Sequence, residues 1–242
     1  MKIHKLMLLA ALGTSTAFSA VEYNFNNGEL DAPITGGIIF NGSGDCLFTG
    51  SLTGEAELHA GNVQVYNMDR FGGDIAMSGG TLELLADDEL HPAEDNTNVT
   101  IPSLHMDTAG TITIHKSAIL AAVDGDGKLT ILGDGEGTGV SFDGDLSGYT
   151  GGLEMGPDLS AHFIATTVLP NADNTFNGAV YLGAPRTTPN KYDSAGKTLT
   201  AAAFYVANGF GEVRSNLFQG AVKTNEINLS SDSIWRVPVS AR

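Results

Sequence analysis

The sequence has little cysteine. Cys46 is the only one, so no disulfide can form within the chain, and stability has to come from a packed core and from backbone hydrogen bonds. Cys46 lies in an apolar stretch with no histidine close to it in sequence. That setting is typical of a buried structural thiol and not of a nucleophile, which needs a lowered pKa.

Positive charge is also scarce. Twelve lysines and arginines stand against 28 acidic residues, which gives a formal net charge of −16. An acidic chain without a lysine or arginine cluster repels nucleic acid, so we expect no nucleic-acid partner. The same charge disfavours sulfated and sialylated glycans, because these are anions too.

Long hydrophobic runs are absent, since no segment approaches the ~20 apolar residues that a membrane-spanning helix needs. The short apolar run Leu6–Leu12 follows Lys2 and Lys5 and precedes the small residues Ser19 and Ala20. This layout is typical of a secretory signal peptide. We therefore expect a secreted or cell-surface protein, cleaved after Ser19 or Ala20, without membrane insertion.

What the sequence does contain is a repeated short unit. Seven times a glycine is followed, two residues later, by an apolar–any–apolar triplet. This alternation predicts a short strand with one buried face after a tight turn. We expect the alternating apolar side chains to form the core. The triplets are Val63–Val65, Ile75–Met77, Leu82–Leu84, Ile112–Ile114, Leu129–Ile131, Leu153–Met155 and Val180–Leu182.

A second motif, aromatic–any–Gly–any–apolar, overlaps the first. An aromatic residue beside a glycine turn can stack on its counterpart one turn away, although the uneven spacing indicates insertions between turns. Together the motifs predict an all-β protein, an irregular right-handed parallel β-solenoid. The aromatic positions are Phe48, Phe71, Phe142, Tyr149, Phe176 and Phe218.

These units resemble the glycine-rich β-strand repeats of autotransporter passengers and other exported bacterial β-solenoids. The likeness is clearest at residues 146–153, Leu-Ser-Gly-Tyr-Thr-Gly-Gly-Leu, and extends over roughly residues 40–185. We expect a signal peptide at 1–20, a β-repeat domain at 21–185, and a loop with a C-terminal capping segment at 186–242 that includes Trp235.

Two segments interrupt the repeats. Residues 87–96 and 184–193 are polar and contain proline, which predicts surface loops. Residues 198–206 are apolar with consecutive alanines, and their pattern is compatible with either a short helix or a buried strand.

Metal sites are weakly indicated. Asp124, Asp126 and Asp134 could bind Ca²⁺ in turns, but Lys128 and Leu129 stand where an EF-hand loop needs a ligand and a glycine. Plain solvated turns fit these aspartates as well.

Histidine gives no zinc signature. Strand alternation would place His105 and Asp107 on one side, but two ligands do not make a zinc site. We therefore predict no cofactor. The histidines beyond residue 20 are His59, His91, His105, His115 and His162.

One pair of short motifs indicates a specific catalytic chemistry. Residues 107–110 and 193–196 are two copies of Asp-Ser/Thr-Ala-Gly, 86 residues apart. They resemble the signatures that the two halves of an aspartic protease contribute to a shared site, in which two carboxylates hold one proton. By this resemblance Asp107 and Asp193 would be catalytic, supported by Thr108 and Ser194.

The motif departs from that family because Ala109 and Ala195 stand where it has glycine. In a regular solenoid, moreover, 86 residues correspond to about four turns, nearly 20 Å at ~4.8 Å per turn. Such a distance would prevent a shared proton.

Two functions are compatible with these observations. The first is an exported aspartic endopeptidase acting on extracellular protein or glycoprotein, mucin included, because the whole chain resembles small secreted mucin-directed proteases of gut bacteria. The second is a non-catalytic β-solenoid surface or adhesion protein that binds glycan or host protein. The duplicated motif favours the first, and solenoid repeats favour the second. The oligomeric state is left open.

Overall fold

The structure is a computed structural model. Residues 1–19 of the predicted signal peptide, the predicted loop at 87–96 and Asp134 lie outside the residues that it describes. The described residues are 20–66, 68, 71, 73–86, 99–133, 138–144, 146, 148–163, 172–182, 190–206, 216–229 and 233–236. At 182, 190–197, 206, 216–221, 228–229 and 233–236 the description covers the backbone alone.

The described residues form 21 strands and no α-helix, as the glycine-bounded triplets predict. No helix in this part of the chain is long and apolar enough to span a membrane. The strands are β1 (Val21–Phe25), β2 (Gly28–Leu30), β3 (Pro33–Ile34), β4 (Ile38–Phe48), β5 (Ser51–Leu52), β6 (Ala56–Val65), β7 (Ile75–Met77), β8 (Thr81–Leu84), β9 (Val99–Ile101), β10 (Leu104–Met106), β11 (Gly110–Ile114), β12 (Ala118–Leu120), β13 (Val123–Gly125), β14 (Leu129–Gly133), β15 (Gly139–Phe142), β16 (Leu153–Met155), β17 (Ser160–Phe163), β18 (Asn174–Leu182), β19 (Asn190–Val206), β20 (Asn216–Leu229) and β21 (Ser233–Arg236).

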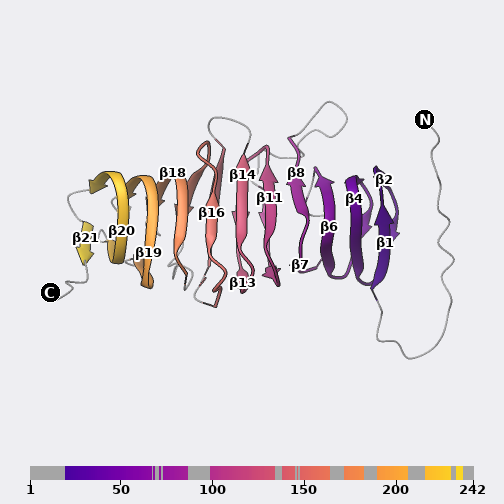
Figure 1. Ribbon diagram of the computed structural model, residues 1–242, viewed down its shortest axis with the longest axis horizontal. Helices are drawn as coiled ribbons and strands as arrows, with labels where there is room; N and C mark the ends of the chain where they lie inside the picture. Colours follow the sequence, from indigo (N-terminus) through magenta and orange to yellow (C-terminus); the bar gives the residue numbers. More distant parts are fainter. Residues whose placement is uncertain are drawn as a thin grey trace.

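The strands stack into a parallel β-solenoid, seen side-on in Figure 1. The first face contains β1, the beginnings of β4 and β6, and then β7, β10 and β13. The second face runs from β2 through β8, β11, β14 and β16 to the middle of β20. The third face joins β9, β12, β15 and β17 to the later parts of β18, β19 and β20.

The core runs along the inside of these faces. All seven predicted triplets lie in strands, and the apolar side chains predicted for burial are at most 1% exposed, apart from Leu182, whose side chain lies outside the description. Each turn therefore adds one layer of aliphatic and aromatic side chains to a continuous core, as hydrophobic burial requires. The sequence prediction of the fold is confirmed.

Glycine marks corners where one turn lies directly on the next. A Cβ at Gly127 would lie 2.0 Å from the carbonyl oxygen of Thr108, and one at Gly151 would lie 2.0 Å from that of Gly127. No side chain fits at such distances. The glycines of the repeat are thus required by the close approach of neighbouring backbones.

Tyr149, the aromatic residue of the best-matching repeat, closes the same corner from inside. Its side chain is fully buried, and its hydroxyl lies 2.6 Å from the carbonyl oxygen of Gly127 and 2.7 Å from that of Gly152. The hydroxyl also accepts a hydrogen bond from the backbone N–H of Leu129 at 2.8 Å. Burial raises the pKa of Tyr149, so the phenol stays protonated. The tyrosine hydroxyl thus links backbone groups of two neighbouring turns at this corner.

Other aromatic residues of the motif meet inside the core, but edge to face and not in the stacked arrangement that the motif predicts. The rings of Phe48 and Phe71 are 5.0 Å apart, and those of Phe142 and Phe176 are 6.4 Å apart. Cys46 is also fully buried, and burial raises its pKa to about 12. A protonated, inaccessible thiol agrees with the structural role expected for it.

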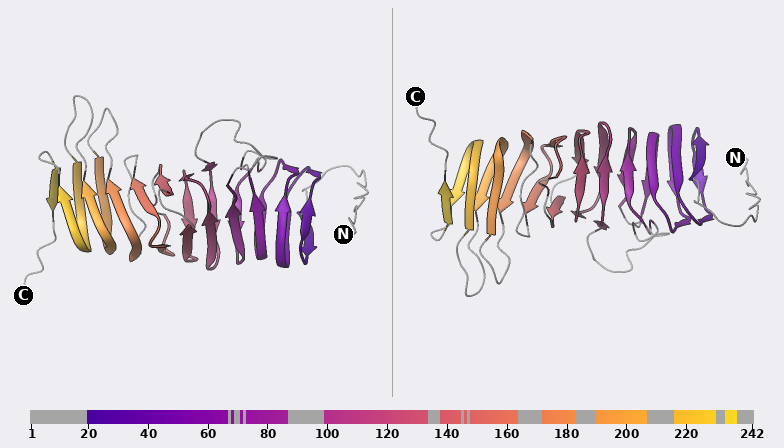
Figure 2. Two further views of the ribbon diagram at one scale, coloured as in Figure 1. Left: turned by 90° about the horizontal axis from the view of Figure 1, so that it is seen from above. Right: turned by 90° about the horizontal axis from the view of Figure 1, so that it is seen from below.

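The C-terminal part corrects one prediction. Residues 190–193, which were predicted as part of a loop, begin strand β19 and pair with residues 216–219 of β20. Backbone pairing decides the structure here, because a ladder accepts polar side chains on its outer face. Residues 198–206 form a strand and not a helix, with Leu199 and Phe204 buried. Figure 2 shows β19–β21 continuing the stack. The domain boundary at 185 stays a prediction.

Candidate functional site

Asp107 and Thr108 lie at the corner between β10 and β11, on the outside of the solenoid. Their backbone N–H groups both approach the carbonyl oxygen of Met77, at 2.9 Å and 3.4 Å. The side chain of Asp107 is 55% exposed. The corner therefore fixes the backbone through the turn below and presents the carboxylate to solvent.

His105 joins two of the aspartates singled out in the sequence. Its Nε2 is 3.1 Å from Oδ1 of Asp107, and its Nδ1 is 2.6 Å from Oδ1 of Asp124. The register of β10 with β13 places His105 directly beside Asp124. The hydrogen bond to Asp124, helped by the charges of both aspartates and opposed by partial burial, raises the pKa of His105. The raised pKa favours the protonated imidazole, which would form a surface ion pair with these aspartates.

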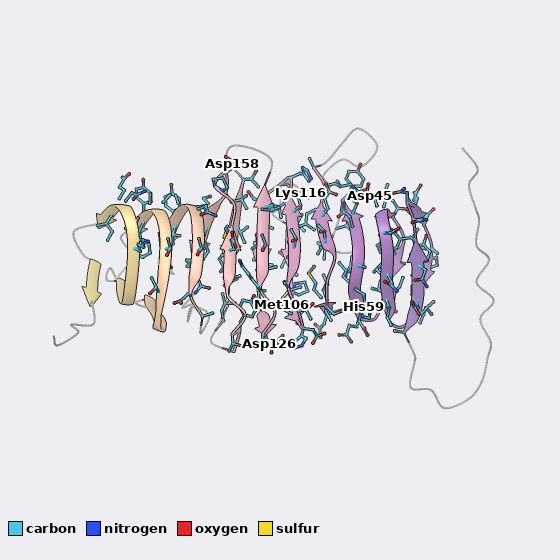
Figure 3. The ribbon with its side chains drawn as sticks, in the orientation of Figure 1. Asp45, His59, Met106, Lys116, Asp126 and Asp158 are labelled. Atoms are coloured by element: carbon cyan, nitrogen blue, oxygen red, sulfur yellow. The ribbon has the colours of Figure 1, made fainter. Side chains whose placement is uncertain are left out.

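The calcium candidates are not gathered by this arrangement. Asp124 contacts His105, while Asp126 is exposed at the adjoining corner, on the edge of the solenoid opposite Asp158 (Figure 3). Asp134 lies outside the described residues. Within the described part of the chain, no three histidine, cysteine or acidic side chains converge in a way that could hold a metal ion.

Asp193 and Ser194 lie in β19, where the description covers the backbone alone. The strands that follow the two aspartate motifs belong to one ladder on the second face. Thr111 pairs with Thr130, Thr130 with Glu154, Glu154 with Thr175 and Thr175 with Thr200. Four steps at ~4.8 Å amount to about 19 Å along the axis.

This separation bears directly on the predicted catalytic pair. Two carboxylates share a proton only when they are about 3 Å apart. The register therefore weighs against a dyad formed by Asp107 and Asp193 of one chain. Their catalytic role stays a prediction, because the position of the Asp193 side chain is not described.

The third face carries a feature that the sequence patterns did not reveal. The outward side chains Ser141, His162, Tyr181 and Tyr205 follow one another in register on successive turns. The rings of His162 and Tyr181 stack at 4.8 Å with an angle of 8°, and those of Tyr181 and Tyr205 stack at 4.8 Å with an angle of 11°. We call His162, Tyr181 and Tyr205 the aromatic column.

Polar groups surround the aromatic column. The Oγ of Ser160 is 2.8 Å from Nε2 of His162, and the hydroxyl of Tyr205 donates a hydrogen bond to Glu226 at 3.2 Å. Burial lowers the pKa of His162, which favours the neutral imidazole. Tyr181 is 37% exposed, a high value for a large aromatic residue on a strand. The column is thus a partly open, mostly uncharged surface with hydrogen-bonding groups at its side.

One local signal pointed to this column. Tyr181 and Tyr205 each stand between two apolar residues in an alternating strand, a position that faces outward. Their alignment with His162 depends on the register of three different turns, which no single segment encodes.

Comparison of the chain with family models, with curated proteins and with solved structures gave no match.

Proposed function

We propose that this protein is an exported, non-catalytic β-solenoid that binds extracellular glycan or host protein through its side. The aromatic column on the third face is the observation that carries the proposal. Tyrosine combines a large apolar surface with a polar tip and is enriched at binding surfaces. A large aromatic residue that is 37% exposed on a regular strand suits a surface that another molecule covers.

The architecture supports the same function. A stacked solenoid offers a long, regular surface, which repeat proteins commonly use for binding. Its ladders hold exposed side chains in fixed positions, so little conformational entropy is lost when a ligand binds. The two aspartate motifs, in contrast, are attached to turns four steps apart in the ladder.

The binding function is tested with mucin, a glycoprotein that carries both candidate ligands. We expect the purified protein to bind mucin-coated wells saturably and albumin-coated wells only at background. The acidic surface opposes electrostatic attraction to mucin, so moderate salt should not weaken the binding. Equal binding to both surfaces, or none to either, would rule out this function.

A second candidate is an exported aspartic-type endopeptidase acting on extracellular protein, mucin included. The exposed carboxylate of Asp107 and its contact with His105 favour this candidate, because they give the aspartate a partner that can exchange a proton. The distance along the ladder between the Asp107 and Asp193 motifs counts against this candidate, because an aspartic protease needs its two carboxylates close together.

The endopeptidase is tested with unfolded casein and no added metal, from acidic to mildly alkaline pH. If it is correct, Asp107→Asn and Asp193→Asn each abolish cleavage, because the shared proton needs both carboxylates. Asp126→Asn is the matched control at a neighbouring exposed corner and should leave cleavage unchanged. Absence of cleavage by the unaltered protein rejects this candidate.

A further inference from the structure

We propose that the aromatic column binds an uncharged oligosaccharide chain that lies along the axis of the solenoid. The proposal rests on the binding function above and names the class of ligand and its site. His162, Tyr181 and Tyr205 occupy three successive turns with parallel rings 4.8 Å apart. Such a repeat presents planar rings at equal intervals, which suits a ligand that is itself a chain of similar units.

The chemistry of the column matches that of a sugar. A sugar ring has apolar C–H faces that pack against aromatic carbon and hydroxyl groups that need hydrogen-bond partners. The faces of the Tyr181 ring are covered by His162 and Tyr205, so the column offers the aromatic edge of Tyr181 and the hydroxyls of Tyr181 and Tyr205. Ser160 adds a hydroxyl beside His162, and Glu226 adds an acceptor beside Tyr205. Apolar and polar contacts therefore alternate within one short surface.

The neighbouring positions leave room for a ligand. Next to the column, the positions two residues earlier on the same strands are occupied by Ser160, Ala179 and Ala203, and Ala179 pairs with Ala203. None of these side chains is larger than serine, whereas those of the column are aromatic. The rings therefore stand above a shelf of small residues, and a linear chain can lie on the shelf against their edges.

The negative charge of the protein favours an uncharged ligand. The chain has a formal net charge of −16, and Glu226 adds a carboxylate at the end of the column. Burial lowers the pKa of His162, which therefore supplies little positive charge at neutral pH. No lysine or arginine is among the residues of the column or the shelf. A sulfated or sialylated glycan would meet repulsion here without compensation.

Binding to mucin from which sialic acid has been removed tests the site. The unaltered protein should bind desialylated mucin at least as well as native mucin. Tyr181→Ala and Tyr205→Ala should each weaken this binding about tenfold or more, the range expected for a central aromatic contact. Tyr181→Phe keeps the ring and should retain most of the binding. Thr111→Ala, an outward residue on the second face, is the matched control.

The outcomes separate this inference from the general function. Unchanged far-UV circular dichroism of each variant shows that its fold is intact. If the protein binds desialylated mucin and the two tyrosine variants bind equally well, the site is wrong while the binding function stands. If mucin stripped of its glycans binds equally, the ligand is peptide and the inference is overturned. If the unaltered protein binds no form of mucin, both proposals fail.

Discussion

Glu83 is the side chain on which three neighbouring turns converge. It is 16% exposed, and its carboxylate accepts hydrogen bonds from the side-chain amides of Asn62 and Gln64. Nε2 of His115 lies 2.7 Å from its other oxygen. Burial by itself would raise the pKa of Glu83, but the hydrogen bonds from Asn62, Gln64 and His115 outweigh burial, and the pKa is lowered.

The lowered pKa predicts how stability depends on pH. The folded chain holds the Glu83 carboxylate more strongly deprotonated than the unfolded chain does. Its contribution is therefore present above the ordinary pKa of about 4.3 and is lost as pH falls through the lower folded value. We expect Glu83→Gln to reduce the free energy of unfolding at neutral pH by about 1–3 kcal/mol. Urea denaturation at neutral pH and at about pH 3 measures the effect, which should shrink at the acidic pH.

A matched substitution separates this effect from a general loss of charge. Glu57 is 36% exposed, and Nε2 of the exposed His59 lies 3.2 Å from its carboxylate. Glu57→Gln should change the free energy of unfolding by no more than about 0.5 kcal/mol. An equal loss for the two variants would contradict the role given to Glu83.

At the scale of the element, the repeat depends on corners as much as on strands. Each triplet delivers its apolar side chains to the core, and the glycine before it lets the next turn approach closely. Gly151 sits against the carbonyl oxygen of Gly127, whereas Gly148, three residues earlier, has no atom within 4 Å of its missing Cβ. The same segment thus contains one glycine that the structure requires and one that it does not.

This contrast gives a direct test of the corner. In Gly151→Ala the new methyl group would lie 2.0 Å from a backbone oxygen, so the two turns have to move apart. We expect a loss of stability of about 1–3 kcal/mol or more, the usual cost of overpacking. Gly148→Ala, in open space, should be close to neutral. Thermal unfolding followed by circular dichroism compares them, and equal midpoints would show that the corner tolerates a side chain.

The elements also show where sequence patterns stop being informative. Alternation and glycine spacing are local properties, so the seven triplets could be placed in strands without the structure. Residues 190–193 contain no such pattern and were predicted as a loop, yet they pair with β20. Their strand conformation depends on a partner 26 residues further along the chain, since Asn190 pairs with Asn216. Long-range pairing of this kind leaves no local signal.

At the scale of the whole molecule, a linear stack combines a strong negative charge with end strands that, within the described residues, pair on one side only, β1 with β4 and β21 with β20. Unpaired strand edges are templates for further pairing. The formal charge of −16 opposes such contacts at neutral pH through repulsion between copies. We therefore expect the protein to be more soluble and to self-associate less where its net negative charge is larger.

Association near the isoelectric point tests this balance. The sequence has a pI of about 4.5, where the repulsion vanishes. We expect the apparent mass in light scattering to rise when the pH is lowered from about 7.5 to about 4.5, because edges and exposed aromatic side chains can then meet. The mass should fall again on return to the starting pH. An unchanged mass at the two pH values would show that charge does not limit contact between copies.

The sequence alone determined the all-β repeat, its buried triplets and its acidic surface, because alternation, glycine turns and charge are properties of short segments or of composition. Only the tertiary structure decided which residues of different turns meet. His162, Tyr181 and Tyr205 are 19 and 24 residues apart, and Asp107 and Asp193 are 86 apart, so no fixed period relates them. Insertions of unequal length separate the turns. Packing and backbone pairing across turns set the register of the ladder. That register brings the three rings into contact and places the two aspartate motifs four steps apart.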